Sequence, residues 1–168
     1  MLKLNDLFVT YGDTAHAELA VFLDLLRSLG MIHHQHHWQA TGSQAYGDHL
    51  LFQRLYEAID LEIDQLGEKT VGLGGNPLVD SRHALVNMPR FINAVEEGLV
   101  ISPDESPALA KVRRSLLAER SFITAGEKLM KMLESKGQLT RGVENLLGGI
   151  LDTHETHVYL LEQRSKTT

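Results

Sequence analysis

Apolar residues recur at helical spacing over residues 13–40, a segment with one glycine and no proline. The pattern continues to Trp38 and places one face of a helix against a core, through Leu19, Phe22, Leu23, Leu26, Leu29 and Ile32. The stretch TGSQAYG then interrupts it. Residues 46–71 carry a second pattern of this kind, through Leu51, Leu55, Ile59, Ile63 and Leu66. The glycines and proline of GLGGNPLVD indicate where this helix ends.

Two further long helices are predicted in the second half of the chain. Residues 81–98 have only a short pattern interrupted by Pro89, so at most a small helix is expected there, within a long connection. SPDESP places Pro107 and acidic residues where a third long helix begins, and that helix is expected to reach about Lys136. KGQLT interrupts the chain again, and residues 139–164 predict the fourth helix.

The matched lengths of these segments indicate the fold class. Four helices of roughly 25 residues would each be about 37 Å long. The alternating β-branched positions typical of strands do not occur. A single domain over residues 1–168, built as a four-helix bundle with a long second-to-third connection, is therefore predicted. Another all-α fold is the alternative.

Composition narrows the chemistry more than the fold. The 168 residues include no cysteine, so any metal ion would be held by nitrogen and oxygen ligands. The net charge is −6, and neither the first dozen residues nor the final EQRSKTT is strongly basic, which disfavours DNA binding. No apolar run predicts a membrane span, and the start MLKLNDLFVTYGD is unlike a secretory signal. The expected location is therefore the cytoplasm.

A row of polar residues follows one face of the second predicted helix. Its members are separated by three or four residues and are His49, Gln53, Glu57, Asp60, Asp64 and Glu68. A solvated surface is the ordinary explanation of such a row. However, the only cations nearby, Arg54 and Lys69, lie off this line, and like charges four residues apart repel. A bound cation is the expected source of compensation.

Imidazoles gather immediately before this row, at His33, His34, His36 and His37. The seven-residue break TGSQAYG can fold the chain so that His37 and His49 approach each other. Asp64 and Glu68 lie roughly 22 and 28 Å beyond His49 along the helix, too far to share a metal ion with it. A second copy of the helix, antiparallel across a two-fold axis, would bring them together. The spacing therefore predicts an oligomer with two equivalent sites per dimer.

These residues resemble the Dps family, the mini-ferritins of the ferritin-like superfamily, over nearly the whole chain. The most specific features are His37–Trp38, a glycine soon after, DHLLF with its His49, and Asp64 and Glu68 before GLGG. The closing NLLGGILDTHETHVYLLEQR also resembles the last helix of the family. The resemblance implies an all-α, ferritin-like four-helix bundle with a short extra helix between helices 2 and 3. It also implies a hollow dodecamer built from two-fold dimers.

The resemblance also implies roles for individual residues. His37 and His49 would be imidazole ligands from one subunit, and Asp64 and Glu68 would be carboxylate ligands from its partner. Trp38 would lie beside the site, where it could take part in electron transfer.

Gln53 departs from the family pattern, which usually has aspartate at this position. An amide oxygen can coordinate a metal ion but carries no charge, which weakens the second iron position. The residues that could compensate are Glu57, Asp60, His33 and His36. Gln53 and Asp60 are accordingly further candidate ligands, whereas His34 is expected to be hydrogen-bonded or to face solvent.

Two other groups of residues are less promising. HETH, from His154 to His157, lacks the spacing of the zinc protease motif HExxH, so catalysis is not expected there. A di-iron site inside the bundle could draw on Asp13, His16 or Glu119. Such a site needs Glu-x-x-His on each of two helices, and the sequence contains none, which argues against it.

The resemblance implies a ferroxidase and iron-storage protein. Fe²⁺ would be oxidised by hydrogen peroxide or dioxygen between subunits, and the ferric product would mineralise inside the shell, protecting against oxidative stress. Iron is the expected metal, with zinc or manganese as substitutes. A non-catalytic shell that binds DNA or zinc is the rival interpretation, which Gln53 keeps open. A metal enzyme acting on a small organic substrate is the third.

Overall fold

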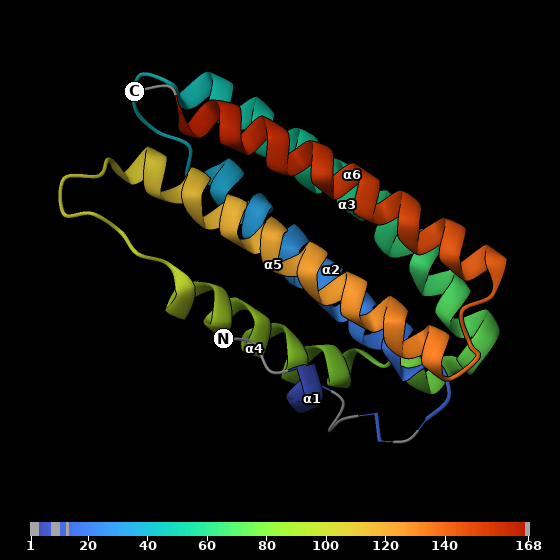
Figure 1. Ribbon diagram of the computed structural model, residues 1–168. Helices are drawn as coiled ribbons and strands as arrows, with labels where there is room; N and C mark the ends of the chain where they lie inside the picture. The colour runs from blue at the N-terminus through green and yellow to red at the C-terminus, as the bar shows by residue number, and fades with distance from the viewer. Residues whose placement is uncertain (1–3, 8–10, 13, 167–168) are drawn as a thin grey trace.

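The computed structural model describes residues 4–7, 11, 12 and 14–166, apart from the side chains of residues 4 and 5. Its elements are α1 (Leu4–Leu7), α2 (Ala17–Trp38), α3 (Ala45–Gly74), the 3₁₀ helix η2 (Asn76–Val79), α4 (Ser81–Gly98), α5 (Pro107–Ser135) and α6 (Arg141–Ser165). The long helices α2, α3, α5 and α6 run alongside one another (Figure 1). The predicted ferritin-like four-helix bundle is confirmed, and no strand occurs among the described residues.

Local capping explains where the last two helices begin. The side chain of Ser106 accepts a hydrogen bond from the backbone N–H of Leu109, and Pro107 occupies the first turn. Thr140 caps α6 in the same way, through the N–H of Val143. Both starts lie within two residues of the predicted ones. The first long helix begins later than predicted, at Ala17, and Asp13 lies outside the described residues.

The prediction for residues 81–98 was wrong in extent, because α4 is an uninterrupted helix of 18 residues. Proline removes one backbone hydrogen bond, to the carbonyl four residues earlier. Here Pro89 and Leu85 both lie on the exposed side of α4, where water can satisfy that carbonyl. The other side of α4 buries Phe91 and Val95 against α2 and α5, which offsets the lost hydrogen bond.

A polar network fastens α4 to α2 inside the molecule. Asp24 is buried, and its carboxylate accepts hydrogen bonds from Tyr11 at 2.6 Å and from Asn87 of α4 at 2.8 Å. Because buried polar groups need such partners, this network fixes the position of α4 on the bundle.

The bundle core is closely packed at the crossing of α2, α5 and α6. Phe22 and Phe122 meet edge to face, with ring centroids 5.1 Å apart. Gly126 allows this approach, since a Cβ there would lie 2.8 Å from Leu151 Cδ2.

Among the described residues, no helix is both long and apolar enough to cross a membrane.

Candidate metal centres

The break between α2 and α3 brings His37 and His49 together, as the length of the break predicted. Their rings are stacked, with centroids 3.7 Å apart and an interplanar angle of 28°. His37 lies in the last turn of α2 and His49 in the first turns of α3, so the short connection forces the two residues into contact.

Two hydrogen bonds fix the tautomers of this pair. His37 Nδ1 lies 3.0 Å from the carbonyl of His49, and His49 Nδ1 lies 3.2 Å from the carbonyl of His37. A carbonyl only accepts, so each Nδ1 carries a hydrogen, which leaves Nε2 as the nitrogen of each ring that can bind a metal ion. Histidines that bind metals are typically held in this way. The stacked pair therefore presents two imidazole donors at an accessible surface.

The predicted carboxylates lie farther along α3. Asp64 and Glu68 are exposed, and no ion pair within the described part of the chain involves either of them. The chain alone does not bring them to the histidine pair. Their role as ligands from a second subunit stays a prediction.

The residues between the histidines and the carboxylates form local contacts. Gln53 donates a hydrogen bond through Nε2 to Glu57 at 2.7 Å, which leaves its amide oxygen available to a cation. Asp60 lines a groove of about 300 Å³ together with Arg27, His34 and Tyr56.

His34 and Trp38 form an aromatic cluster beside that groove. The His34 ring stacks on Tyr56, with centroids 4.3 Å apart, and also lies 4.3 Å from the ring of Trp38. Trp38 is 70% exposed, so most of its indole faces solvent in the single chain. Its expected role in electron transfer stays a prediction.

The side chains of His33 and His36 lie inside the bundle, away from the surface pair of His37 and His49. They therefore cannot supply the ligand that Gln53 fails to provide at the surface. Both are buried, because residues three apart on α2 share the face that turns into the bundle. The side chain of Ser115 on α5 lies 3.0 Å from His33 Nδ1 and 2.7 Å from His36 Nδ1.

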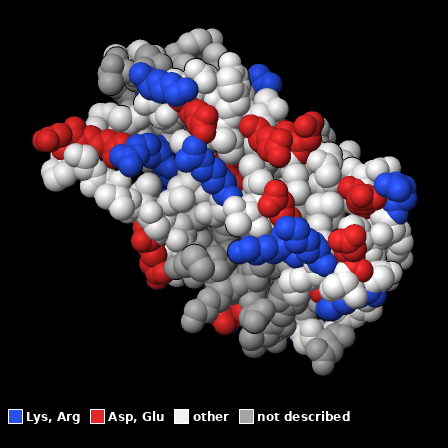
Figure 2. All heavy atoms as spheres, in the orientation of Figure 1, with Lys and Arg blue, Asp and Glu red and all other residues white. Residues whose placement is uncertain are grey.

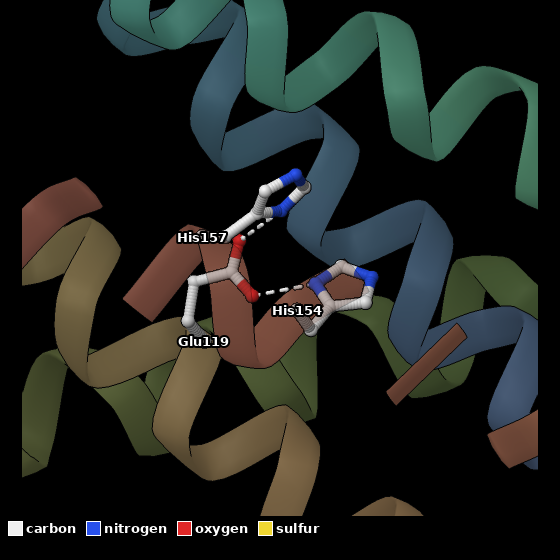
Figure 3. Close-up of side chains that lie close together, drawn as sticks. All are labelled: Glu119, His154 and His157. Carbon is white, nitrogen blue, oxygen red and sulfur yellow. Dashed lines mark hydrogen bonds and ion pairs between the residues drawn. The ribbon is translucent and has the colours of Figure 1, made fainter. Parts of the chain in front are cut away.

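The bundle interior contains a second group of potential ligands, shown in Figure 3. Glu119 of α5 points toward His154 and His157 of α6, and all three are buried. Glu119 Oε2 lies 2.5 Å from His154 Nδ1, and Glu119 Oε1 lies 3.1 Å from His157 Nδ1. One ligand atom from each residue lies within 4.8 Å of the other two, a spacing that could hold a metal ion.

The remaining two bundle helices also contribute to this interior group. His33 of α2 donates through Nε2 to Glu119 Oε1 at 2.8 Å, and His154 Nε2 lies 3.0 Å from Glu62 of α3. We call His33, Glu62, Glu119, His154 and His157 the interior cluster. Its five residues come from four different helices, and each is at most 8% exposed.

Charge is shared unevenly within the interior cluster. Burial alone would lower the pKa of His154, but the charges and hydrogen bonds of Glu119 and Glu62 outweigh it and raise the pKa to about 9. Burial alone would raise the pKa of Glu119, yet the surrounding histidines, chiefly His154, hold it well below its ordinary value. Burial lowers the pKa of His33. His154 is therefore an imidazolium between carboxylates, and His33 is neutral.

The interior cluster was not predicted from the sequence for two reasons. HETH lacks the spacing of HExxH, and Glu119 belongs to no Glu-x-x-His motif. The available signal was carboxylates within apolar stripes: Glu62 falls between Ile59 and Leu66, and Glu119 is three residues before Phe122. His16, the other candidate, precedes α2 and donates its backbone N–H to Gln138 instead.

The four-helix bundle is ferritin-like, and histidine and carboxylate groups lie both between its helices and on its surface. No protein-family model matches the chain. The chain is 29% identical over 125 residues to the "Nutrient stress-induced DNA-binding protein" of a Synechococcus strain. The match covers 74% of this chain and 65% of the relative. This similarity is consistent with the resemblance of the chain to the Dps family.

Proposed function

We propose that this protein is a ferroxidase and iron-storage mini-ferritin whose oxidation sites form between two-fold-related subunits. The observation that carries the proposal is the stacked pair of His37 and His49, whose two Nε2 atoms are free to bind a cation. The exposed Asp64 and Glu68 of a second copy would supply the charge that this pair lacks.

The register of the proposed dimer also addresses Gln53. In an antiparallel pairing that sets His49 opposite Asp64, Gln53 comes opposite Asp60, because the residue numbers of each facing pair give the same total. Asp60 of the second copy would thus bring a carboxylate to the position where the family usually has one. The amide oxygen of Gln53 would act as a neutral ligand beside it.

Exposed apolar side chains support a second copy on this face. They flank the polar row of α3 and include Trp38, Tyr46, Leu50 and Leu61. Several large apolar side chains exposed along one face are typical of an interface. Assembly as a dodecamer would give a particle of about 226 kDa, twelve times the 18.8 kDa chain.

Ferrous iron is the substrate in this proposal. Each Fe²⁺ gives up one electron, so two ions reduce one hydrogen peroxide, which takes up two protons and leaves as two waters. Dioxygen would accept the same two electrons and two protons to give hydrogen peroxide. Imidazoles favour the ferrous ion and carboxylates the ferric ion, so the mixed ligand set suits turnover. The ferric product would be stored as mineral, and the consumption of peroxide would protect against oxidative stress.

The test is peroxide-driven iron oxidation without oxygen, followed by ultraviolet absorbance. His49→Ala should slow the initial rate at least tenfold, because it removes half of the imidazole pair. His34→Ala is the matched control, since His34 lies at the same end of α2 but outside the pair. Wild-type oxidation no faster than the buffer blank would refute the proposal, as would equal rates in the two variants.

DNA binding is a second candidate function, favoured by the name of the Synechococcus relative. Figure 2 shows basic and acidic side chains mixed on the face it displays. Several arginines are ion-paired, including Arg114 with Glu96 at 2.7 Å and Arg113 with Glu105 at 3.0 Å. These pairs and the net charge of −6 weaken attraction to phosphates. A gel-shift assay with a salt titration tests whether the protein binds DNA in addition to oxidising and storing iron.

A further inference from the structure

We propose that the interior cluster binds one divalent transition-metal ion of the zinc class, held by Glu119, His154, His157 and His33 as a closed structural site. This site is separate from the proposed oxidation sites on the surface and does not depend on them. It would connect α2, α5 and α6 at the centre of the bundle.

The potential ligand atoms of the interior cluster already lie close together. Oxygen and nitrogen atoms of Glu119, His154 and His157 already lie within 4.8 Å of one another, whereas ligands around a zinc ion stand about 3.3 Å apart at metal–ligand distances near 2.1 Å. Small side-chain rotations would close this difference. His33 Nε2, 2.8 Å from Glu119 Oε1, is the next nitrogen on the same carboxylate.

Burial of the interior cluster costs free energy, because its ionisable side chains lose their hydration. Five ionisable side chains lie inside an otherwise apolar bundle, and each loses its hydration there. The apolar residues around them, such as Phe122 against His154 at 4.4 Å, do not repay that loss. Buried groups of this kind are usually paired or bound to a metal ion. The hydrogen bonds within the cluster offset part of this loss, and a dication would offset more of it by neutralising the two carboxylates of Glu62 and Glu119.

Two of the proposed ligands have hydrogen-bond partners that would hold their rings in place. A histidine that binds a metal through one nitrogen usually donates its other N–H to a carboxylate or another acceptor. His154 meets this condition, because its Nε2 faces Glu62 while its Nδ1 faces Glu119. His33 meets it through Ser115, whose hydroxyl lies between His33 Nδ1 and His36 Nδ1. Both rings are held in place from behind.

The donor set determines the class of metal. Three imidazole nitrogens and one carboxylate oxygen suit zinc and similar borderline ions, whereas magnesium and calcium prefer oxygen alone. Four protein ligands fill a tetrahedral ion and leave no position for an oxidant, which is the mark of a structural site. The interior site is therefore expected to stabilise the bundle rather than to oxidise iron.

A surface groove reaches one member of the interior cluster. A groove of about 410 Å³ lies between α3 and α6, lined by Ala58, Leu61, Glu62, Gln65, Gly149 and Thr153 among others. Glu62 is the one member of the cluster that reaches this groove, and it remains 8% exposed. Its carboxylate can receive a cation from the groove and pass it to His154.

The test uses Co²⁺ as a spectroscopic substitute for zinc in chelator-treated protein. Wild type and His49→Ala should each bind one Co²⁺ per chain with the intense visible absorption of a tetrahedral ion, which Zn²⁺ then displaces. Glu119→Gln and His157→Ala should lose this absorption. Glu155→Gln, an exposed carboxylate of α6 beside both histidines, is the matched control and should keep it.

Each other outcome overturns the proposal. An absent or weak visible band in wild type means that the cluster is only a hydrogen-bonded ion network. A band lost in His49→Ala but kept in Glu119→Gln assigns the metal to the surface. Circular dichroism reports whether the interior variants fold. If they do not, wild type and His49→Ala decide the question, because Zn²⁺ must then raise the melting temperature of both equally.

Discussion

The run HHQHH at the end of α2 serves two different environments. His33 and His36 turn inward toward Ser115, while His34 and His37 face the groove and the surface pair. Residues three apart share a helix face, so the same short sequence supplies both the interior cluster and the proposed oxidation site. This division explains why imidazoles are crowded here.

Gln53 and Asp60 give a prediction for individual residues of the proposed oxidation site. Gln53→Asp should increase the rate of peroxide-driven oxidation, since it adds a charge beside the iron; a tenfold gain in iron affinity corresponds to about 1.4 kcal/mol. Asp60→Asn should decrease the rate, because Asp60 is the carboxylate that the second copy sets opposite Gln53 in the dimer register. Initial rates at subsaturating Fe²⁺ provide the measurement. An unchanged rate in Asp60→Asn would show that the register is wrong.

The stability of chelator-treated protein should depend on pH through the charge of His154. The pKa of His154 is raised from 6.5 to about 9, so its charge favours the folded state fully below pH 6.5. This contribution is lost as the pH rises through about 9, a change on the order of 3 kcal/mol. Urea unfolding midpoints across this range should therefore fall. His154→Gln should show a flatter decline, and a level wild-type profile would contradict the assignment.

Among the elements, the crossing of α2, α5 and α6 depends on one glycine. Gly126→Ala would place a Cβ 2.8 Å from Leu151 and 3.0 Å from Phe22, and such overpacking costs roughly 1–3 kcal/mol. Gly148→Ala in α6 is the control, because nothing lies within 4 Å of its Cβ and alanine favours a helix by up to about 1 kcal/mol. Thermal unfolding should show opposite shifts. A loss in both variants would attribute the effect to something other than packing.

The elements differ in how far their local sequence determines them. The four long helices were predictable because apolar spacing and signals such as Ser106–Pro107 are local. The extent of α4 was not, since the local effect of Pro89 was offset by burial of Phe91 against distant helices. The interior cluster was missed for a similar reason. Glu119 and His154 are 35 residues apart, and only the packing of α5 on α6 shows that they meet.

At the scale of the whole molecule, the single chain carries half of each proposed oxidation site. His37 and His49 are at one end of the polar row, and the carboxylates they need lie about 22 Å away on the same helix. Assembly and iron oxidation are therefore expected to depend on the same surface. The interior cluster, in contrast, is complete within one chain.

Leu61 can test whether iron oxidation depends on assembly. Leu61 is 70% exposed on α3, and the antiparallel register places it opposite the turn of the second copy that carries Leu50. Leu61→Glu should leave the chain folded, because the side chain contributes little to the core. It should nevertheless break the dimer, since the new charge would be buried against an apolar surface beside an acidic row.

Light scattering after size exclusion should show a smaller particle for Leu61→Glu, and the oxidation rate should fall together with the mass. Val100→Glu, on the exposed connection between α4 and α5, is the control and should keep both. Visible absorption of Co²⁺ bound at equilibrium should survive in both variants, because the proposed interior site needs no second copy and Leu61 lines the groove but is not a proposed ligand. If Leu61→Glu were monomeric yet oxidised iron at the wild-type rate, the oxidation site would have to lie within the single chain. The interior cluster would then be the place to search for it.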